Sequence, residues 1–271
     1  MKVAAIQLRS GIEVEPNLLA AEKLIRAAAQ KGARLIVTPE MTHILQRSPK
    51  RLFAALQVEN MDRGVDFFAG LAKELGVYLL IGSLAILKSE GRAANRSFLF
   101  GPSGETLARY DKIHLFDVTV SRAETWKESN VYDRGDRAVT ASIEGAKLGL
   151  SICYDVRFAG LYRKYAEAGA HIMTVPAAFT KPTGEAHWEA LLRARAIETG
   201  SFVIAPAQGG THEDGRTTFG HSHIIGPWGD IIAKLDNDEP GYITADINLD
   251  DVAAARAKIP AWQHNPGYTL S

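Results

Sequence analysis

The sequence predicts an α/β fold in which helices cover a β-rich core, and three observations support this prediction. Short apolar runs typical of strands alternate along the chain with longer segments typical of helices. Of the 271 residues, 46% are hydrophobic and 23% are charged, which suits a domain with a sizeable core. No linker, low-complexity tract or short repeat interrupts the pattern. We therefore expect a single domain over residues 1–271.

In the first half of the chain, predicted strands alternate with predicted helices that end at glycines. An Ala-rich helix stops at Gly32 and a later helix stops at Gly76, because glycine favours the left-handed conformation that ends a helix. The turn Gly101-Pro102-Ser103-Gly104 closes a hairpin. The expected strands are 3–8, 34–38, 77–87, 95–100 and 105–110, and the expected helices are 17–31, 50–57 and 63–75.

In the second half, residues 114–136 are predicted to be a long polar loop that forms the wall of a pocket. The helix expected over 186–198 is apolar on one face, which carries Ala190, Leu191, Ala194 and Ile197. The other expected helices are 159–168 and 250–258. The expected strands are 138–143, 147–153, 171–176, 201–207, 219–226, 230–235 and 242–246.

The charge balance and the cysteine content exclude several classes of protein. Lys+Arg and Asp+Glu number 31 each, so no basic excess indicates nucleic acid and no acidic tail is present. A single cysteine excludes an intrachain disulfide and suits a reducing compartment. The apolar start of the chain is too short for a signal peptide, and no run approaches membrane-spanning length. We expect a soluble cytoplasmic protein.

Cys153, the lone cysteine, is a candidate nucleophile. The apolar run from Ala146 to Ile152 predicts a buried strand, and polar groups begin just after it, before a helix-like segment. The thiol therefore lies at the carboxyl end of a strand, which is the edge where α/β sheets bind ligands. The alternative is a small hydrophobic residue packed in a core. Position alone does not decide between these two interpretations.

Glu40 and Lys112 also follow predicted strands. Glu40 comes after the apolar strand 34–38 and Pro39, where a carboxylate is costly unless it is paired or used. Lys112 leaves the returning arm of the hairpin. Taken singly, each residue is better interpreted as a surface charge.

Taken together, three motifs resemble the nitrilase, or carbon–nitrogen hydrolase, superfamily in order and approximate spacing, and the similarity runs from Met1 to Tyr268. Further matching stretches are 183–189, 193–198, 220–222 and 227–229. The resemblance implies an αββα four-layer sandwich that pairs into an αββα–αββα dimer, and a Glu-Lys-Cys catalytic triad. The motifs are Thr38-Pro39-Glu40, Asp111-Lys112-Ile113-His114-Leu115-Phe116 and Ser151-Ile152-Cys153-Tyr154-Asp155-Val156-Arg157-Phe158.

The resemblance implies roles for five residues in amide hydrolysis. Cys153 is the nucleophile, and Glu40 takes its proton, returns it to the leaving amine and then activates water to break the thioester. Lys112 supplies positive charge, and the backbone N–H of Tyr154 is the second donor to the oxyanion. Glu128 matches a second glutamate of the family that orients Lys112 or the substrate amide; its alternative interpretation is a loop charge.

Two positions after Cys153 leave open questions. Three roles remain open for Arg157: binding a substrate carboxylate, holding Asp155, or holding a carboxylate of a neighbouring chain. The sequence does not choose between them. Gly160 departs from the family pattern, because many members carry a glutamate there. An ion pair of the family is missing at this place, while the triad is intact.

The sequence gives little support to a metal or a cofactor. His221 and His223 lie two residues apart on one predicted strand, but a metal site needs a third ligand and no carboxylate is obvious nearby. His187 and Trp188 begin the helix that carries Arg193, and we expect them to pack rather than to transfer protons. Phosphate-loop, dinucleotide-binding, serine-hydrolase and zinc-protease motifs are absent from the sequence. We expect neither a metal nor a cofactor.

The residues after the nucleophile favour the amidase branches of the family. Tyr154-Asp155 differs from the Trp-Glu that usually follows the cysteine of nitrilases proper. Segments 193–199 and 207–212 resemble the deaminated-glutathione amidases, and the omega-amidases are close relatives of these. We expect hydrolysis of the distal primary amide of a small 2-oxo acid, with release of ammonia. The alternatives are an omega-amidase acting on 2-oxoglutaramate, an N-carbamoyl amine or amino-acid amidohydrolase, and a nitrilase.

Two hypotheses from other classes also remain. A Cys-His hydrolase would use one of the eight histidines as its base, but no local motif of such a family accompanies them. A non-catalytic binding protein on the same fold would not need Glu40, Lys112 and Cys153 together. We expect small-molecule amides as ligands, no nucleic acid, no membrane, and a homodimer or a higher even oligomer.

Overall fold

Two β-sheets pack face to face in the computed structural model, which describes all residues except 122–123, 265, 268 and 271. The first is seven-stranded, with the order β17-β1-β2-β3-β4-β5 and with β8 paired to β4. Strands β1, β2 and β3 run parallel, so their carboxyl ends reach one edge of the sheet. Its strands are β1 (Lys2–Gln7), β2 (Leu35–Val37), β3 (Tyr78–Ser89), β4 (Arg92–Phe100), β5 (Thr106–Asp111), β8 (Tyr132–Asp133) and β17 (Gly241–Asp246).

The second sheet is six-stranded, with the order β16-β15-β12-β11-β10-β9. Its central strands β10, β11 and β12 are again parallel, and their carboxyl ends lie together. Two small hairpins stand apart from the two sheets: β6 (Asp117–Ser121) with β7 (Glu124–Lys127), and β13 (Gly209–Thr211) with β14 (Thr217–Phe219). The strands of the second sheet are β9 (Thr140–Ile143), β10 (Ala146–Leu150), β11 (Ile172–Thr174), β12 (Phe202–Ala205), β15 (His223–Ile225) and β16 (Ile231–Lys234).

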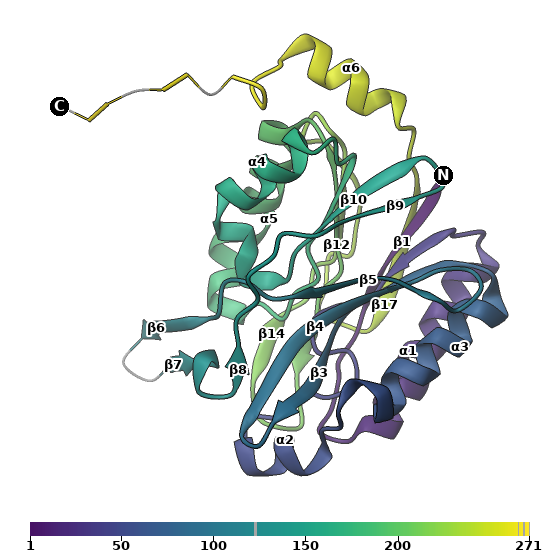
Figure 1. The fold of residues 1–271 in the computed structure, drawn as a ribbon, viewed down its shortest axis with the longest axis vertical. Helices are drawn as coiled ribbons and strands as arrows, with labels where there is room; N and C mark the ends of the chain where they lie inside the picture. The colour runs from purple at the N-terminus through teal and green to yellow at the C-terminus, as the bar shows by residue number, and fades with distance from the viewer. Residues whose placement is uncertain (122–123, 265, 268, 271) are drawn as a thin grey trace.

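Helices cover the outer face of each sheet, so the layers follow the order helix, sheet, sheet, helix (Figure 1). Helices α1 and α3 lie on the first sheet, and α4 and α5 lie on the second. Helix α3 starts at the Asp62 cap, whose side chain accepts from the Val65 N–H, and ends at Gly76 in the left-handed conformation. The helices are α1 (Val14–Gln30), α2 (Pro49–Ala55), α3 (Arg63–Leu75), α4 (Ala159–Glu167), α5 (Lys181–Thr199) and α6 (Asp250–Lys258), with short 3₁₀ helices η1 (Glu59–Met61), η2 (Glu128–Asn130) and η3 (Cys153–Arg157).

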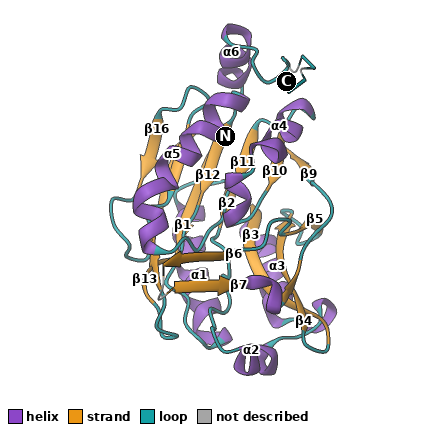
Figure 2. Cartoon of the chain, turned by 90° about the vertical axis from the view of Figure 1, so that its left-hand side faces the viewer, coloured by secondary structure: helices purple, strands orange, loops and turns teal. Residues whose placement is uncertain are grey.

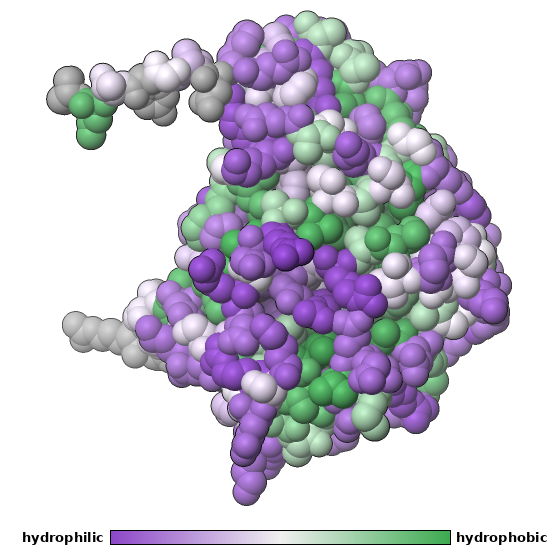
Figure 3. Space-filling model, in the orientation of Figure 1, coloured by the Kyte–Doolittle hydropathy of each residue, from purple (hydrophilic) through white to green (hydrophobic). Residues whose placement is uncertain are grey.

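Successive side chains of β1 point to opposite faces of the sheet, and both faces are buried. Val3 and Ala5 pack between the sheets, whereas Ala4 and Ile6 pack under α1 and α3. The four layers confirm the predicted α/β fold and agree with the sandwich that the resemblance implied. On the face shown in Figure 3, hydrophilic residues predominate and apolar residues appear in small groups between them. Among the described residues, no helix is long and apolar enough to cross a bilayer.

Three predictions about elements were wrong. Residues 114–136 are not one loop, because they include β6, β7, η2 and β8; residues 122–123 of this stretch lie outside the described part, as does Tyr268 at the end of the matched region. The predicted strand 219–226 is split at His221, whose backbone has a φ of 56°. Helix α5 begins at Lys181, five residues before the predicted start at residue 186.

The apolar face predicted for α5 is not the one that α5 buries. Ala190, Ala194 and Ile197 are exposed, and the helix instead packs through a stripe one position away, whose members include an arginine. The buried arginine is tolerated because its Nε donates to the Val156 carbonyl at 2.7 Å and its Nη1 donates to Glu198 at 2.8 Å. The buried residues of α5 are Gly184, Trp188, Leu192, Arg195, Ala196 and Thr199.

Candidate active site

A cavity of about 340 Å³ opens where the parallel strands of both sheets end. Glu40 follows β2 and Cys153 follows β10, and the carboxyl ends of parallel strands bring such residues to one edge. The β6–β7 hairpin and the chain up to β8 form a further wall, so residues 114–136 line a pocket as predicted. The charged residues on its wall are Glu40, Arg47, Lys112, Lys127, Glu128 and Arg216.

Cys153 begins η3 in a left-handed conformation, with a φ of 50°, that is rare for residues other than glycine. Its N–H donates to the Pro176 carbonyl at 2.8 Å, which fixes the turn, and the residue is 7% exposed. Burial, together with the negative charge of Glu40, raises the pKa of the thiol well above its ordinary value, although Lys112 acts in the opposite direction. At neutral pH the sulfur is therefore a thiol.

Glu40 lies beside the sulfur and is almost fully buried. Its Oε1 accepts from Lys112 Nζ and from Asn95 Nδ2, both at 2.8 Å, and its Oε2 accepts from the Ala178 N–H at 3.0 Å. Burial opposes ionisation of the carboxyl, but the charge and hydrogen bond of Lys112, with bonds from Cys153 and Asn95, lower its pKa below the ordinary value. Glu40 is therefore an ionised acceptor next to a neutral thiol.

Lys112 is 2% exposed and connects the two glutamates of the site. Its Nζ lies 2.8 Å from Glu40 Oε1 and 2.8 Å from Glu128 Oε2. Burial opposes its charge, yet Glu128 and Glu40 raise the pKa of the ammonium well above its ordinary value. Glu128 also accepts from the Phe116 N–H at 2.7 Å, which ties the start of the hairpin wall to the same cluster.

Asn95 and Ala178 belong to this cluster and were missed by the sequence analysis. Asn95 Nδ2 donates to Glu40 and also to Glu128 Oε1 at 3.1 Å, and the backbone carbonyl of Asn95 accepts from the Lys112 N–H at 3.0 Å. An amide within a strand was the available clue, because an amide that becomes buried in a sheet needs partners. Ala178 contributes only its backbone, so no side chain could have indicated it.

Asp155 joins the loop that carries Lys112 to the turn that carries Cys153. Its fully buried carboxylate accepts from the Tyr110 hydroxyl at 2.7 Å, the Ile152 N–H at 2.8 Å and the His114 N–H at 3.0 Å. His114 Nδ1 lies 2.7 Å from the same carboxylate. These contacts leave no place for Arg157, so the hypothesis that Arg157 holds Asp155 was wrong.

Arg157 lies beside the cavity wall rather than on it. Its guanidinium carbon is 5.3 Å from the ring centre of Phe179 and 5.9 Å from that of Tyr154, both of which line the cavity. Its terminal nitrogens lie 3.3 Å from His187 Nδ1. Within the described part of the chain, Arg157 has no carboxylate partner, so its charge remains available at this edge of the site.

His221 and His223 do not form a metal site with other residues. His223 Nδ1 lies close to the His221 carbonyl, and its Nε2 is 3.6 Å from Glu189 of α5, a carboxylate that the sequence did not reveal. His221 stacks on Phe219 instead. Across the described residues, no group of three or more His, Cys, Asp or Glu side chains is placed to hold a metal ion. At Gly160, a Cβ atom would meet nothing within 4 Å.

The comparison with curated proteins gives matches over nearly the whole chain. The model of the carbon-nitrogen hydrolase family matches residues 2–257. The chain is 41% identical to the deaminated glutathione amidase of Synechocystis over 265 residues, which are 96% of each protein. It is 37% identical to the omega-amidase of Xenopus tropicalis over 246 residues, which are 90% of this chain and 87% of that protein.

Solved structures match in the same way. The C. elegans NitFhit protein superposes with a TM-score of 0.89 at 31% identity; the match covers 97% of this chain and 64% of the nematode chain. An amidase variant from Nesterenkonia superposes with a TM-score of 0.80 at 27% identity, covering 96% of this chain and 98% of that one. In that amidase structure, acrylamide has added to the active-site cysteine.

Proposed function

The chain belongs to the carbon–nitrogen hydrolase family and is an amidase, and from that premise we propose that Cys153, Glu40 and Lys112 hydrolyse its amide substrate through a thioester. One observation carries this proposal: an ionised Glu40 lies between the thiol of Cys153 and the ammonium of Lys112 inside a cavity. A nucleophile, a base that contacts it and a fixed cation are what acyl transfer requires.

In the acylation step, Glu40 removes the proton of the thiol while Sγ attacks the amide carbon. Because burial keeps the sulfur protonated at rest, the proton must move as the C–S bond forms. Protonated Glu40 then gives this proton to the amide nitrogen, the C–N bond breaks, and the amine leaves. Cys153 remains acylated and Glu40 is ionised again.

In the second step, Glu40 takes a proton from water, and the resulting hydroxide attacks the thioester carbon. The C–S bond breaks, the acid is released, and the thiolate recovers the proton from Glu40. In both steps the negative charge on the carbonyl oxygen is stabilised by Lys112 Nζ and by the N–H of Tyr154, the residue that follows the nucleophile and lines the cavity. Glu128 holds Lys112 in place for this role.

We propose deaminated glutathione as the preferred substrate and a 2-oxo-acid amide as the substrate class. The name of the Synechocystis relative supports this choice, and the name of the Xenopus relative supports 2-oxoglutaramate as the alternative. In glutathione the distal carboxyl is joined to the cysteine amine. With deaminated glutathione the amide is therefore secondary and the leaving group is the amine of cysteinylglycine. The expected primary amide and release of ammonia apply to 2-oxoglutaramate and are corrected for deaminated glutathione. Arg157, at the Tyr154–Phe179 edge, is our candidate for the carboxylate of the 2-oxo acid.

We further propose that the enzyme acts in the cytoplasm as a homodimer, without a cofactor. A single cysteine that must stay a free thiol supports a reducing compartment. An exposed apolar patch formed by Ile197 of α5 together with Trp228 and Ile259 supports the dimer.

The test is a panel assay with wild type and Cys153→Ala. Wild type should hydrolyse deaminated glutathione and 2-oxoglutaramate faster than an N-carbamoyl amino acid or a nitrile, and should form an acyl adduct on Cys153 detectable by mass spectrometry. Cys153→Ala should lose turnover and the adduct. Near-normal kcat in Cys153→Ala would disprove the mechanism. A nitrile with the highest kcat/KM would disprove the substrate class.

A further inference from the structure

The outer wall of the cavity carries positive charge that the proposed chemistry does not use. Lys112 is neutralised by Glu40 and Glu128, which are the acidic residues on the wall. The remaining charged residues of the wall are Arg47, Lys127 and Arg216, and of these Arg216 forms an ion pair with Asp214, which lies outside the wall. These come from the loop before α2, from β7 and from the residue before β14. A cavity with this lining attracts an anionic ligand.

Two of these cations lie on one aromatic ring. The guanidinium carbon of Arg47 is 5.1 Å from the ring centre of Trp126, and that of Arg216 is 5.3 Å from it. Each contact is a cation–π interaction, which stabilises a guanidinium over an indole. The ring therefore holds two like charges at the wall of the cavity, and an anion bound there lowers their mutual repulsion.

Arg216 is oriented for such an anion. Its Nε donates to Asp214 Oδ2 at 2.8 Å, and Asp214 also accepts from the Arg216 N–H at 3.1 Å, so the side chain is fixed by its own turn. Among the described residues, no hydrogen bond engages its terminal nitrogens, and Asp214 is not on the cavity wall. The fork of a guanidinium can therefore offer these terminal N–H groups to a carboxylate.

We infer that Arg216 and Arg47, on the ring of Trp126, form a subsite for a carboxylate in the leaving part of the substrate. The inference rests on the proposed function and deepens it, because it names the substrate as an amide with an acidic leaving group. Cysteinylglycine is such a group: its two residues span about 7 Å when extended, and they end in a carboxylate. Arg157, beside Tyr154 and Phe179 on a different wall, remains for the acyl part.

This subsite gives the enzyme a means to distinguish two substrates with the same acyl group. Deaminated glutathione carries a carboxylate on each side of the scissile amide, whereas 2-oxoglutaramate carries one on the acyl side and releases ammonia. Binding energy from Arg216 and Arg47 is then available to the first substrate alone. A charge-assisted contact of this kind corresponds to about 10- to 100-fold in kcat/KM.

The experiment compares Arg216→Met, Arg216→Lys and wild type on both substrates. Methionine keeps a long unbranched stem and removes the charge, while lysine keeps the charge and loses the fork. We expect Arg216→Met to lose about 10- to 100-fold more kcat/KM with deaminated glutathione than with 2-oxoglutaramate, chiefly through KM, and Arg216→Lys to lose less. Arg137→Met, at a side chain 87% exposed and outside the cavity wall, is the matched control and should change neither value.

A second measurement changes the substrate. The glycinamide analogue of deaminated glutathione lacks the terminal carboxylate, so wild type should hydrolyse it about 10- to 100-fold less efficiently, and Arg216→Met should hydrolyse both forms alike. Equal loss by Arg216→Met on both substrates, or an analogue hydrolysed as well as its parent, would overturn the subsite and leave the amidase intact. Wild type inactive on both 2-oxo-acid amides would overturn the proposed function and the subsite with it.

Discussion

At the scale of single residues, the cluster around Lys112 holds more charge than a stable core requires. An ammonium that is 2% exposed lies 2.8 Å from each of two carboxylates. Moving such ions out of water costs several kcal/mol each, and pairing offsets this cost only when the geometry is good. The hydrogen bonds from Asn95 and from the Ala178 N–H supply that geometry for Glu40. We interpret the cluster as retained for its reactivity.

The two glutamates of the cluster should differ in their importance. Glu40→Gln keeps the size of the side chain and loses the base that both steps need, so we expect kcat to fall at least about 1000-fold. Glu128→Gln should cost about 10- to 100-fold, because Glu40 still holds Lys112. Single-turnover kinetics with either 2-oxo-acid amide measures both losses.

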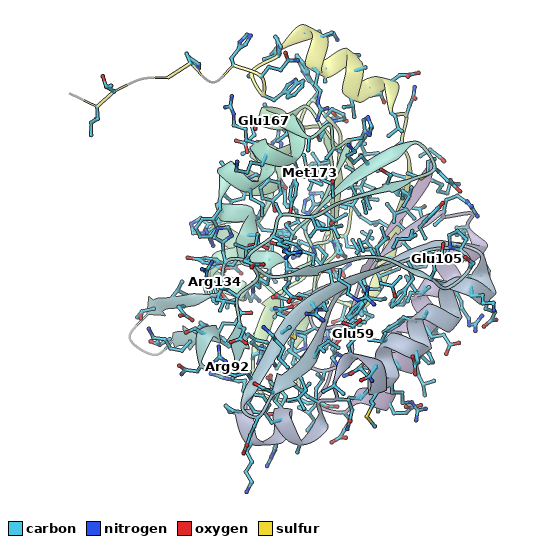
Figure 4. All side chains as sticks on the ribbon, in the orientation of Figure 1. Glu59, Arg92, Glu105, Arg134, Glu167 and Met173 are labelled. Atoms are coloured by element: carbon cyan, nitrogen blue, oxygen red, sulfur yellow. The ribbon has the colours of Figure 1, made fainter. Side chains whose placement is uncertain are left out.

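The control for this pair is Glu105→Gln, at an exposed glutamate beside the 101–105 turn (Figure 4), which should change kcat less than twofold. An essential Glu128 with a dispensable Glu40 would reverse our assignment of the base.

At the scale of elements, the ends of the strands place the site because the two sheets approach closely there. Arg96 of β4 binds Asp111 at 2.6 and 2.8 Å and also pairs with Glu59, so the end of β5 beside Lys112 is fixed. Arg92 binds Asp133 at 2.7 Å and the Tyr132 carbonyl at 2.8 Å, which anchors the segment after Glu128. Both arginines of strand β4 thus hold in place segments that lead to the wall of the cavity.

Gly82 of β3 lies where the two sheets approach closely. A Cβ at this position would lie 2.0 Å from the Thr38 carbonyl oxygen and 2.2 Å from Pro176 Cβ, so the backbone of the Glu40 loop would have to move. We expect Gly82→Ala to lower the free energy of unfolding by about 3 kcal/mol or more and to reduce activity with it. Urea unfolding and kcat/KM measure the two effects.

Gly70→Ala is the matched control for Gly82→Ala. Gly70 lies in α3 with nothing within 4 Å of its would-be Cβ, so this change should raise stability by about 0.5 to 1 kcal/mol. A Gly82→Ala variant as stable as wild type would contradict the close approach of the two sheets.

Asp62, which caps α3, should make stability depend on pH. Burial raises the pKa of its carboxyl from 3.8 to about 6, so the folded state holds the proton more tightly than the unfolded chain. The contribution of Asp62 is therefore most favourable below pH 3.8 and is lost as the pH rises through 6. Asp62→Asn keeps the cap and has no carboxyl group to ionise. The free energy of unfolding of this variant minus that of wild type should therefore increase by about 2 kcal/mol from pH 4 to pH 7.

Two features sharpen this test by urea unfolding. Burial lowers the pKa of the neighbouring His43 to about 4. The neutral histidine therefore favours the folded state above pH 6.5, and this contribution is lost as the pH falls. In wild type, this dependence on pH is opposite to that of Asp62. The exposed Asp66→Asn on the same helix is the control and should show a much smaller trend, because the charge of Asp66 only adds to the rise in the pKa of Asp62. A difference between Asp62→Asn and wild type that stays flat or falls with pH would refute the assignment.

At the scale of the whole molecule, the exposed face of α5 continues onto its neighbours. Ile197 is 54% exposed, and Trp228 and Ile259 are each 56% exposed. The side chain of Ile197 lies against Gly229, next to Trp228, and Lys258 Nζ, next to Ile259, is 5.4 Å from the Trp228 ring. Figure 2 shows α5 beside β16, with α6 above them. A continuous apolar patch of this kind is typical of an interface.

This patch leads us to expect that Ile197→Glu will convert a dimer into a monomer. A charge placed in the patch must lose water when two copies meet, and this cost opposes association. Sedimentation velocity should give twice the 29.5 kDa chain mass for wild type and 29.5 kDa for the variant. Leu107→Glu, at an exposed leucine of β5, should remain a dimer. A monomeric wild type would disprove the expected dimer.

The sequence by itself determined the order of the elements and the residues that stand at strand ends. Apolar runs stop before Glu40 and Cys153, and the returning arm of a hairpin stops before Lys112. All three are local patterns, and burial of both faces of a strand follows from the apolar runs. Helix α6, predicted over 250–258, ends where the pattern ends. Because each strand end is set by nearby residues, these features could be predicted without knowing what packs against them.

Only the tertiary structure decided which side chains share the cavity and which face of α5 is buried. Asn95 joins Glu40 across 55 positions and Arg216 meets Trp126 across 90, and no local pattern encodes contacts at such separations. On α5, the small apolar residues Ala190 and Ala194 stay exposed, while Arg195 is buried because a carbonyl and a glutamate pair with it. The hydrophobicity of a residue reflects only the transfer free energy of its own side chain. Whether the side chain is buried also depends on the hydrogen-bonding and packing partners that surround it in the fold.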